Sequence, residues 1–287
     1  MLQKSLEELA QTEGGRTAIK IIKQNKILQI VILILYILNL CFYILMYDHK
    51  LVFFIVIAII FVLWFCAQIY YARIHKILNE ECDPFKAEEV YTYYYLSYAK
   101  KKLEKKQGAS SKWLYHLYIS YSVLLQGDFE RAFFILNQID RRELDSSKQY
   151  LIFRFHQNMR IYYCYKNDDA VLNNMRNYFV KMSEDKHFKR LYRKWIKKEI
   201  EVIDLHCSLN RGDFSVYEYL SRQPEWTRGT RLQRVATHWM DAKVHNMQKN
   251  QEAAVLDCQY VIENGNRLWY VSMAKQMLSF IENSPEG

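Results

Sequence analysis

Three side chains of one helical segment are of the types that bind metal ions or move protons. Asp241 lies three residues after His238 and His245 lies seven residues after it, so each can share a helical face with His238. The spacing gives no third ligand for a metal ion, and histidines of this kind usually lie in solvent or at the edge of a core. The sequence therefore predicts no metal site and no cofactor.

The chain lacks the motifs of the common catalytic classes. It contains no H-E-x-x-H, G-x-S-x-G or G-x-x-x-x-G-K-[ST] sequence, and the glycines within residues 14–17 do not have the spacing that cradles a phosphate. Its six cysteines lie far apart without a C-x-x-C pair, which is typical of free thiols in a reducing compartment. We expect a protein that is not an enzyme.

A strongly basic segment at 186–198 is a candidate contact surface. At helical spacing, one of its stripes is apolar and consists of Phe188, Leu191, Tyr192, Trp195 and Ile196. The other side carries the cations Lys189, Arg190, Arg193, Lys194, Lys197 and Lys198. Such a face could contact anionic lipid head groups or an acidic protein, or it could simply be solvated. Nucleic acid is disfavoured because the sequence has no helix-turn-helix signature or aromatic platform.

Four tyrosines form a second candidate surface. Tyr91, Tyr94, Tyr95 and Tyr98 follow the i, i+3, i+4, i+7 spacing of one helical face. A stripe of this kind either packs between helices or lines a ligand groove. Packing is the commoner use, because large apolar faces are buried first.

Two long apolar stretches indicate that helices cross a membrane ahead of these surfaces. Residues 27–47 and 51–71 are uncharged blocks of 21 residues, separated by three residues. As a helix each block would extend about 31 Å, close to the ~30 Å hydrocarbon core of a bilayer. The pattern predicts a transmembrane helical hairpin. Its intramembrane polar residues are Gln29, Asn39 and Gln68, of which the two glutamines should lie at a similar depth.

Positive charge flanks the outer ends of the predicted hairpin and not its tip. Residues 16–26 contain four cations and no acid, Arg73 and Lys76 follow the second block, and the tip at 48–50 carries one cation and one anion. The four preceding cations are Arg16, Lys20, Lys23 and Lys26. By the positive-inside rule both termini are cytosolic. A cleaved signal peptide is not expected, because the apolar core is too long and a second span follows.

The rest of the chain is expected to be helical. With 8 glycines and 3 prolines among 287 residues, and a net charge of +9, the sequence supplies few sheet turns or flexible linkers. The predicted fold is all-α. Its parts are a cytosolic N-terminal segment at 1–26, a transmembrane hairpin at 27–71 and a cytosolic helical-repeat domain at 72–287.

One turn recurs along this predicted domain. Residues 127–132 read Gly-Asp-Phe-Glu-Arg-Ala, the start of this sequence returns at 212–214, and looser versions begin at residues 83, 166 and 249. The equivalent positions are Ala87, Ala132, Ala170, Tyr217 and Ala254, spaced 45, 38, 47 and 37 residues apart. A period in this range predicts stacked helical hairpins.

The turn at 127–132 resembles the entry to the second helix of the tetratricopeptide repeat. The resemblance implies that Gly127 permits the tight turn, Phe129 packs between helices and Ala132 allows their close approach, with Gly212 and Phe214 in a second unit. The first-helix W-x-x-L-G-x-x-Y signature is absent, no proline closes the units, and the spacing exceeds the usual ~34 residues. The resemblance implies an α-helical solenoid that binds peptides or protein tails. The hairpin and repeats together are similar to uncharacterised membrane proteins of Gram-positive bacteria, which implies a bacterial cell membrane.

The sequence leads to two functional hypotheses. The first is a membrane-anchored, non-enzymatic helical-repeat scaffold or adaptor that binds a protein partner at the cytosolic face. The alternative is a membrane-tethered regulator that senses a peptide or other small ligand in the repeat groove. Contact with membrane lipids and assembly into a homo-oligomer stay open under both hypotheses.

Overall fold

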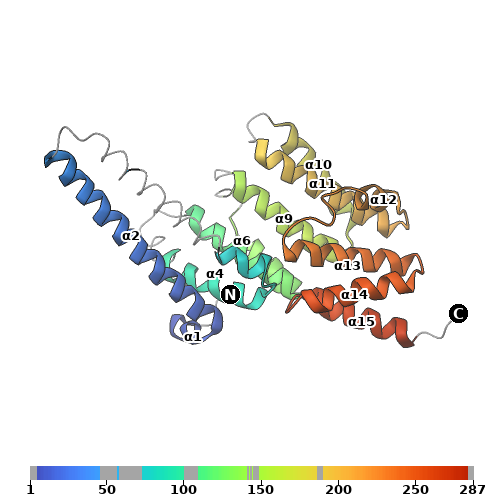
Figure 1. Cartoon of the computed structure of the whole chain (residues 1–287). Helices are drawn as coiled ribbons and strands as arrows, with labels where there is room; N and C mark the ends of the chain where they lie inside the picture. The colour runs from blue at the N-terminus through green and yellow to red at the C-terminus, as the bar shows by residue number, and fades with distance from the viewer. Residues whose placement is uncertain are drawn as a thin grey trace.

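The structure, a computed structural model, describes residues 5–45, 57, 73–99, 109–140, 142, 144, 149–185 and 190–283. Within these residues the chain is helical and has no strand, which confirms the all-α class (Figure 1). The N-terminal helices are α1 (Leu6–Gln11) and α2 (Glu13–Leu45). The helical body contains a helical segment at 73–79, α4 (Pro84–Tyr94), the π-helix η1 (Tyr95–Ala99), α6 (Ala109–Gln126), α7 (Phe129–Asn137), α9 (Gln149–Lys166), α10 (Asp169–Glu184), α11 (Arg190–Asn210), α12 (Ser215–Ser221), α13 (Arg231–Met247), α14 (Gln251–Asn264) and α15 (Trp269–Asn283).

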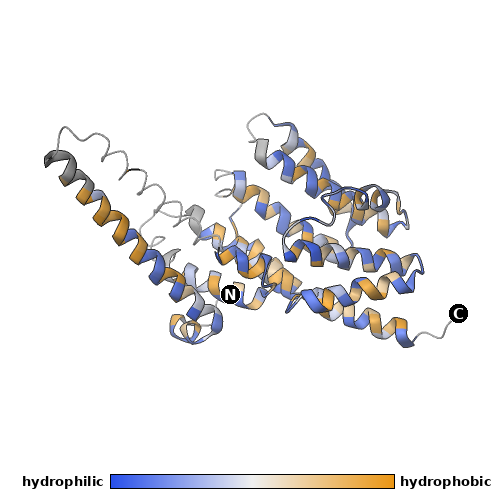
Figure 2. Cartoon of the chain, viewed as in Figure 1, coloured by the Kyte–Doolittle hydropathy of each residue, from blue (hydrophilic) through white to orange (hydrophobic). Residues whose placement is uncertain are grey.

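Helix α2 extends away from the body, with a hydrophobic middle stretch (Figures 1 and 2). Its Glu13–Leu38 portion, of 26 residues, is long and apolar enough to cross a membrane. The 18-residue window that meets this test has a mean hydropathy of 1.7 and is 6% buried. Ile27, Leu33 and Leu38 leave 62%, 57% and 58% of their surfaces exposed. Among the described helices α2 alone meets these criteria, which a signal sequence near an N-terminus would also meet.

The second predicted span, 51–71, lies outside the described residues except for Ile57. The hairpin therefore stays a prediction. Of its polar residues, Gln29 is exposed on α2, whereas Gln68 and the side chain of Asn39 are not described.

The N-terminal segment packs onto the helical body and is not a separate unit. Ala18 and Ile21 of α2 are buried in one core with Ile74 and Val90, which follow the apolar stretches. Gly14 lies so close to α4 that an added Cβ would come within 2.5 Å of the Glu89 Cβ. The predicted boundary between residues 1–26 and 72–287 therefore separates elements that share a core.

Five turns between described helices share one backbone conformation. In each turn one residue after the first helix has a positive φ, namely Cys82 (53°), Gly127 (85°), Asn167 (51°), Gly212 (72°) and Lys249 (60°). An aspartate or asparagine follows in every case, and in four of the five its side chain accepts a hydrogen bond from the backbone N–H three residues later. These capping residues are Asp83, Asp128, Asp168 and Asn250. The short carboxylate or amide satisfies a first-turn N–H that the new helix cannot, and so fixes where that helix begins.

The register of the third turn differs from the prediction. The residue four positions after each turn aspartate or asparagine is buried, and this set is Ala87, Ala132, Leu172, Tyr217 and Ala254. The predicted position Ala170 is exposed on α10, whereas Leu172 is fully buried. Distance from the capping residue sets the register, and matching alanine with alanine placed it two residues too early.

The first and last parts of the helical body pack against each other. The Arg267 N–H donates to the Cys82 carbonyl (3.4 Å), and the Trp269 ring meets the Phe129 ring edge-on at 5.4 Å. Gly127 lies directly against Trp269, because a Cβ at residue 127 would be 3.0 Å from the Trp269 Cβ. Gly127 is therefore required for its positive φ and also for the seating of α15.

Candidate functional site

The basic surface is smaller than the sequence suggests. α11 packs against α10 and α9, and its Ile196 is fully buried. Lys194, Lys197 and Lys198 are exposed. Arg193 is half-buried, and its Nη2 donates to the carbonyl of Asp185 at the end of α10 (3.2 Å). The predicted residues not described at the side-chain level are Phe188, Lys189, Arg190 and Leu191.

Trp195 lies beside these lysines and packs less completely than predicted. Its ring contacts Phe153 and Tyr192, with centroids 5.9 and 5.6 Å away, yet 37% of its surface is exposed. We call Lys194, Trp195, Lys197 and Lys198 the α11 surface. It combines an accessible indole with three ammonium groups.

The tyrosine stripe is a packing face in the structure. Tyr91 and Tyr94 are 2% and 3% exposed, and Tyr91 stacks on Tyr118 with the ring centroids 4.9 Å apart. Tyr95 is half-buried, and the side chain of Tyr98 is not described. The two most buried members cannot line an open groove, because their rings fill the interface between α4 and α6.

A buried polar network joins α9 to α11. The Glu199 carboxylate accepts hydrogen bonds from Gln157 Nε2 (2.6 Å) and Arg160 Nε (2.5 Å), and Arg154 donates to Gln157 and to the Tyr150 hydroxyl. Burial lowers the pKa of the Arg160 guanidinium, but Glu199 and Cys164 together outweigh burial, so the net shift of the pKa is upward. The network thereby holds α9 and α11 in register.

The buried His206 of α11 should make the stability of the fold sensitive to acid. It is 8% exposed, its Nε2 has no hydrogen-bond partner among the described residues, and burial followed by the charge of Lys243 lowers its pKa to about 4. An unfolded histidine, with a pKa near 6.5, binds its proton first as the pH falls, so stability is lost between about pH 6.5 and 4. From pH 7.5 to 5, His206 should account for about 2 kcal/mol of lost stability. In urea unfolding of the detergent-solubilised chain, His206→Leu should lose less stability over this range, and an unchanged loss would contradict the prediction.

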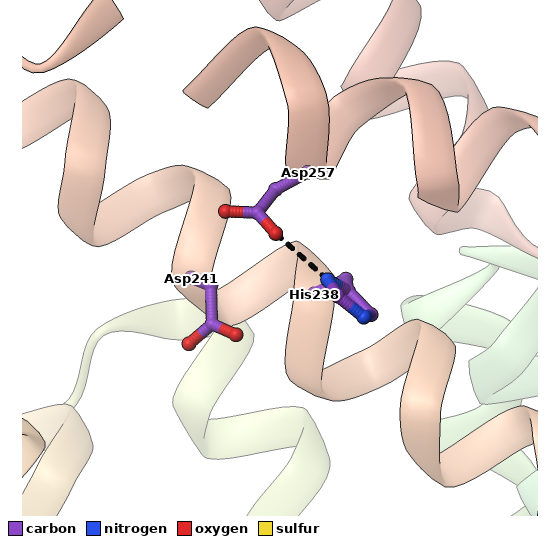
Figure 3. Close-up of side chains that lie close together, drawn as sticks. All are labelled: His238, Asp241 and Asp257. Atoms are coloured by element: carbon purple, nitrogen blue, oxygen red, sulfur yellow. Dashed lines mark hydrogen bonds and ion pairs between the residues drawn. The ribbon is translucent and has the colours of Figure 1, made fainter. Parts of the chain in front are cut away.

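In the structure Asp257 lies next to His238 and Asp241, a neighbour that was not predicted from the sequence. α13 and α14 form an antiparallel pair, and the ligand atoms of His238, Asp241 and Asp257 all lie within 4.8 Å of one another. Figure 3 shows the Asp257 carboxylate reaching from α14 to the His238 ring on α13, with Asp241 beside them. His238 Nδ1 donates to Asp257 Oδ1 at 2.7 Å, and His245 Nδ1 donates to Asp257 Oδ2 at 2.9 Å.

Asp241 is oriented by donors from the α12 region. The Tyr217 hydroxyl and Trp226 Nε1 both donate to Asp241 Oδ1 at 3.0 Å. Burial raises the pKa of the Asp241 carboxyl, and these two hydrogen bonds offset part of the shift. Within the described residues neither Asp241 nor Asp257 forms an ion pair with a lysine or arginine. In the cluster Asp257 is thus paired with two imidazoles, and Asp241 is held by a tyrosine hydroxyl and an indole N–H.

The position of Asp257 beside Asp241 could have been predicted from its distance to the turn between α13 and α14. Asp257 lies eight residues after Lys249, at the turn between α13 and α14, and Asp241 lies eight residues before it. In an antiparallel helical hairpin, residues equally distant from the turn lie at the same level. The recurring turn at Lys249 could therefore have paired the two aspartates.

This cluster and the α11 surface are the chemically distinctive sites of the described residues. They require different tests, because one is a set of metal-type ligands and the other a charged protein surface. None of the protein-family models, curated proteins and solved structures compared with this chain matches it, so its function has to be inferred from its own residues and geometry.

Proposed function

We propose that the chain is a non-enzymatic adaptor, anchored in a membrane by α2 and a second span at 51–71, whose helical body binds a protein partner at the cytosolic face. The observation that carries the proposal is the contact between the segments flanking the apolar stretch. Ala18 and Ile21 precede this stretch and share a core with Ile74 and Val90, which follow it. If α2 spans the bilayer, the chain has to cross again for these flanks to meet in water.

Length and charge support the same arrangement. From Ile27 to Leu45, α2 would extend about 29 Å, close to the ~30 Å hydrocarbon core. The cations of 16–26 are exposed at the end of α2 that packs on the body, which favours a cytosolic body. The recurring capped turns support stacked helix pairs of the tetratricopeptide kind, and the assignment to a bacterial cell membrane rests on the resemblance alone.

The α11 surface supports a protein partner with an acidic segment. An exposed indole among lysines offers apolar contact area together with charge complementarity, and tryptophan is enriched among residues that dominate binding energy. The alternative, a regulator that senses a peptide or other small ligand in the repeat groove, rests on the repeat resemblance, because Tyr91 and Tyr94 are buried.

Photocrosslinking in cells tests the adaptor hypothesis. A photoreactive phenylalanine analogue replaces Trp195 in the full chain, and a control chain carries it at Tyr219, which is 62% exposed on α12. We expect a discrete protein adduct at residue 195 only, lost when Lys194, Lys197 and Lys198 are all changed to Gln. Lipid adducts alone, no adduct, or an adduct that survives the triple change would reject this surface as the partner site.

A further inference from the structure

We propose that His238, Asp241 and Asp257 form a zinc-binding site that joins α13 to α14. Zinc binds imidazole nitrogen and carboxylate oxygen at about 2.0–2.2 Å in tetrahedral geometry, so two ligand atoms of one ion lie about 3.4 Å apart. The three ligand atoms already lie within 4.8 Å of one another, so side-chain rotations of about an ångström would bring them to one ion. The packing of α13 on α14 holds the ligands of the two helices at this separation.

The hydrogen bonds around the cluster distinguish the two oxygens of each carboxylate. Asp241 Oδ1 accepts from Tyr217 and Trp226, which leaves Oδ2 as its ligand atom. Asp257 Oδ2 accepts from His245, which leaves Oδ1, the atom that now accepts from His238. Outer partners of this kind orient the ligands of metal sites and strengthen metal binding. His245, Tyr217 and Trp226 are thus positioning residues.

Charge and access also favour a cation. Asp241 and Asp257 lack lysine and arginine ion pairs within the described part of the chain, and a divalent ion would neutralise both carboxylates. The side chains of His238 and Asp257 are 31% and 14% exposed, so an ion can enter from solvent. One imidazole with two carboxylates suits zinc better than magnesium or calcium, which prefer oxygen ligands throughout. Three protein ligands leave a fourth position for water.

Zinc titration of the full chain in detergent micelles tests the site, with a purification tag that contains no histidine. Isothermal titration calorimetry of Zn²⁺ should give one site with micromolar or tighter affinity, not displaced by millimolar Mg²⁺. His238→Ala and Asp257→Asn should each weaken it at least 100-fold. His156→Ala, which removes a histidine of α9 outside the cluster, should leave the affinity unchanged and controls for non-specific imidazole binding.

A variant of the positioning residue Tyr217 separates a loss of zinc affinity from a loss of folding. Tyr217→Phe keeps the buried ring and removes only the donor to Asp241, so the fold should be kept while zinc affinity falls about 10-fold. Circular dichroism of each variant confirms the fold. Wild-type protein that binds no Zn²⁺ at 100 micromolar would overturn the proposal. So would folded His238→Ala and Asp257→Asn variants that bind zinc as the wild type does.

Discussion

Ala132→Arg is expected to lower the free energy of unfolding by about 3–5 kcal/mol, enough to unfold a marginal domain. Ala132 is fully buried on α7, which packs against both α6 and α9. A guanidinium there overfills the space between helices and places an unpaired charge in an apolar core. Urea unfolding of the detergent-solubilised chain, followed by tryptophan fluorescence, measures the loss.

Ala170→Arg is the matched control, because Ala170 occupies the corresponding place in the predicted alignment but is exposed on α10. We expect it to change stability by less than about 0.5 kcal/mol. If Ala132→Arg unfolds as the parent chain does, or Ala170→Arg is equally damaging, the register of the turns is wrong.

Glu199→Ala should cost a similar amount, about 3–5 kcal/mol, because it leaves the buried Arg160 guanidinium without a counter-charge. The two side chains are 8% and 13% exposed, so water cannot replace the carboxylate well. Glu201→Ala, on the same helix, removes a pair with Lys197 that is 3.9 Å long and largely solvated, and should cost less than about 1 kcal/mol.

A double variant tests whether the cost of Glu199→Ala comes from the stranded charge. Arg160→Met combined with Glu199→Leu removes both charges and keeps apolar volume, so it should recover much of the lost stability. If the double variant is as unstable as Glu199→Ala, a different property of Glu199 stabilises the fold. Thermal melts of the variants at one pH make the comparison.

Local sequence patterns predicted the helices and most turns of the chain. The scarcity of glycine and proline indicated the helical class, and the Gly127 and Gly212 turns were found because glycine with aspartate marks a helix end and the next start. The third turn was misplaced at Ala170 because alanine was matched with alanine, although the buried position four residues after Asp168 is Leu172.

Contacts between distant segments were harder to predict from one sequence. The docking of Ala18 on the body, the burial of Tyr91 and the meeting of Asp257 with His238 each depend on how two helices face each other. Helical periodicity gives the face of each helix but not its neighbour. Of these three contacts, the one between Asp257 and His238 joins helices linked by a short turn, and that turn could have supplied the pairing.

Reporter fusions in a bacterial host test the membrane arrangement most directly. A reporter that is active only outside the cytosol is fused to the N-terminus, inserted at residue 49, or fused to the C-terminus of the full chain. We expect activity only from the insertion at residue 49, because the flanks that share Ala18, Ile21 and Ile74 in one core must lie on the same, positively flanked side. Activity from one terminus and not the other would show a single crossing and contradict the anchored hairpin.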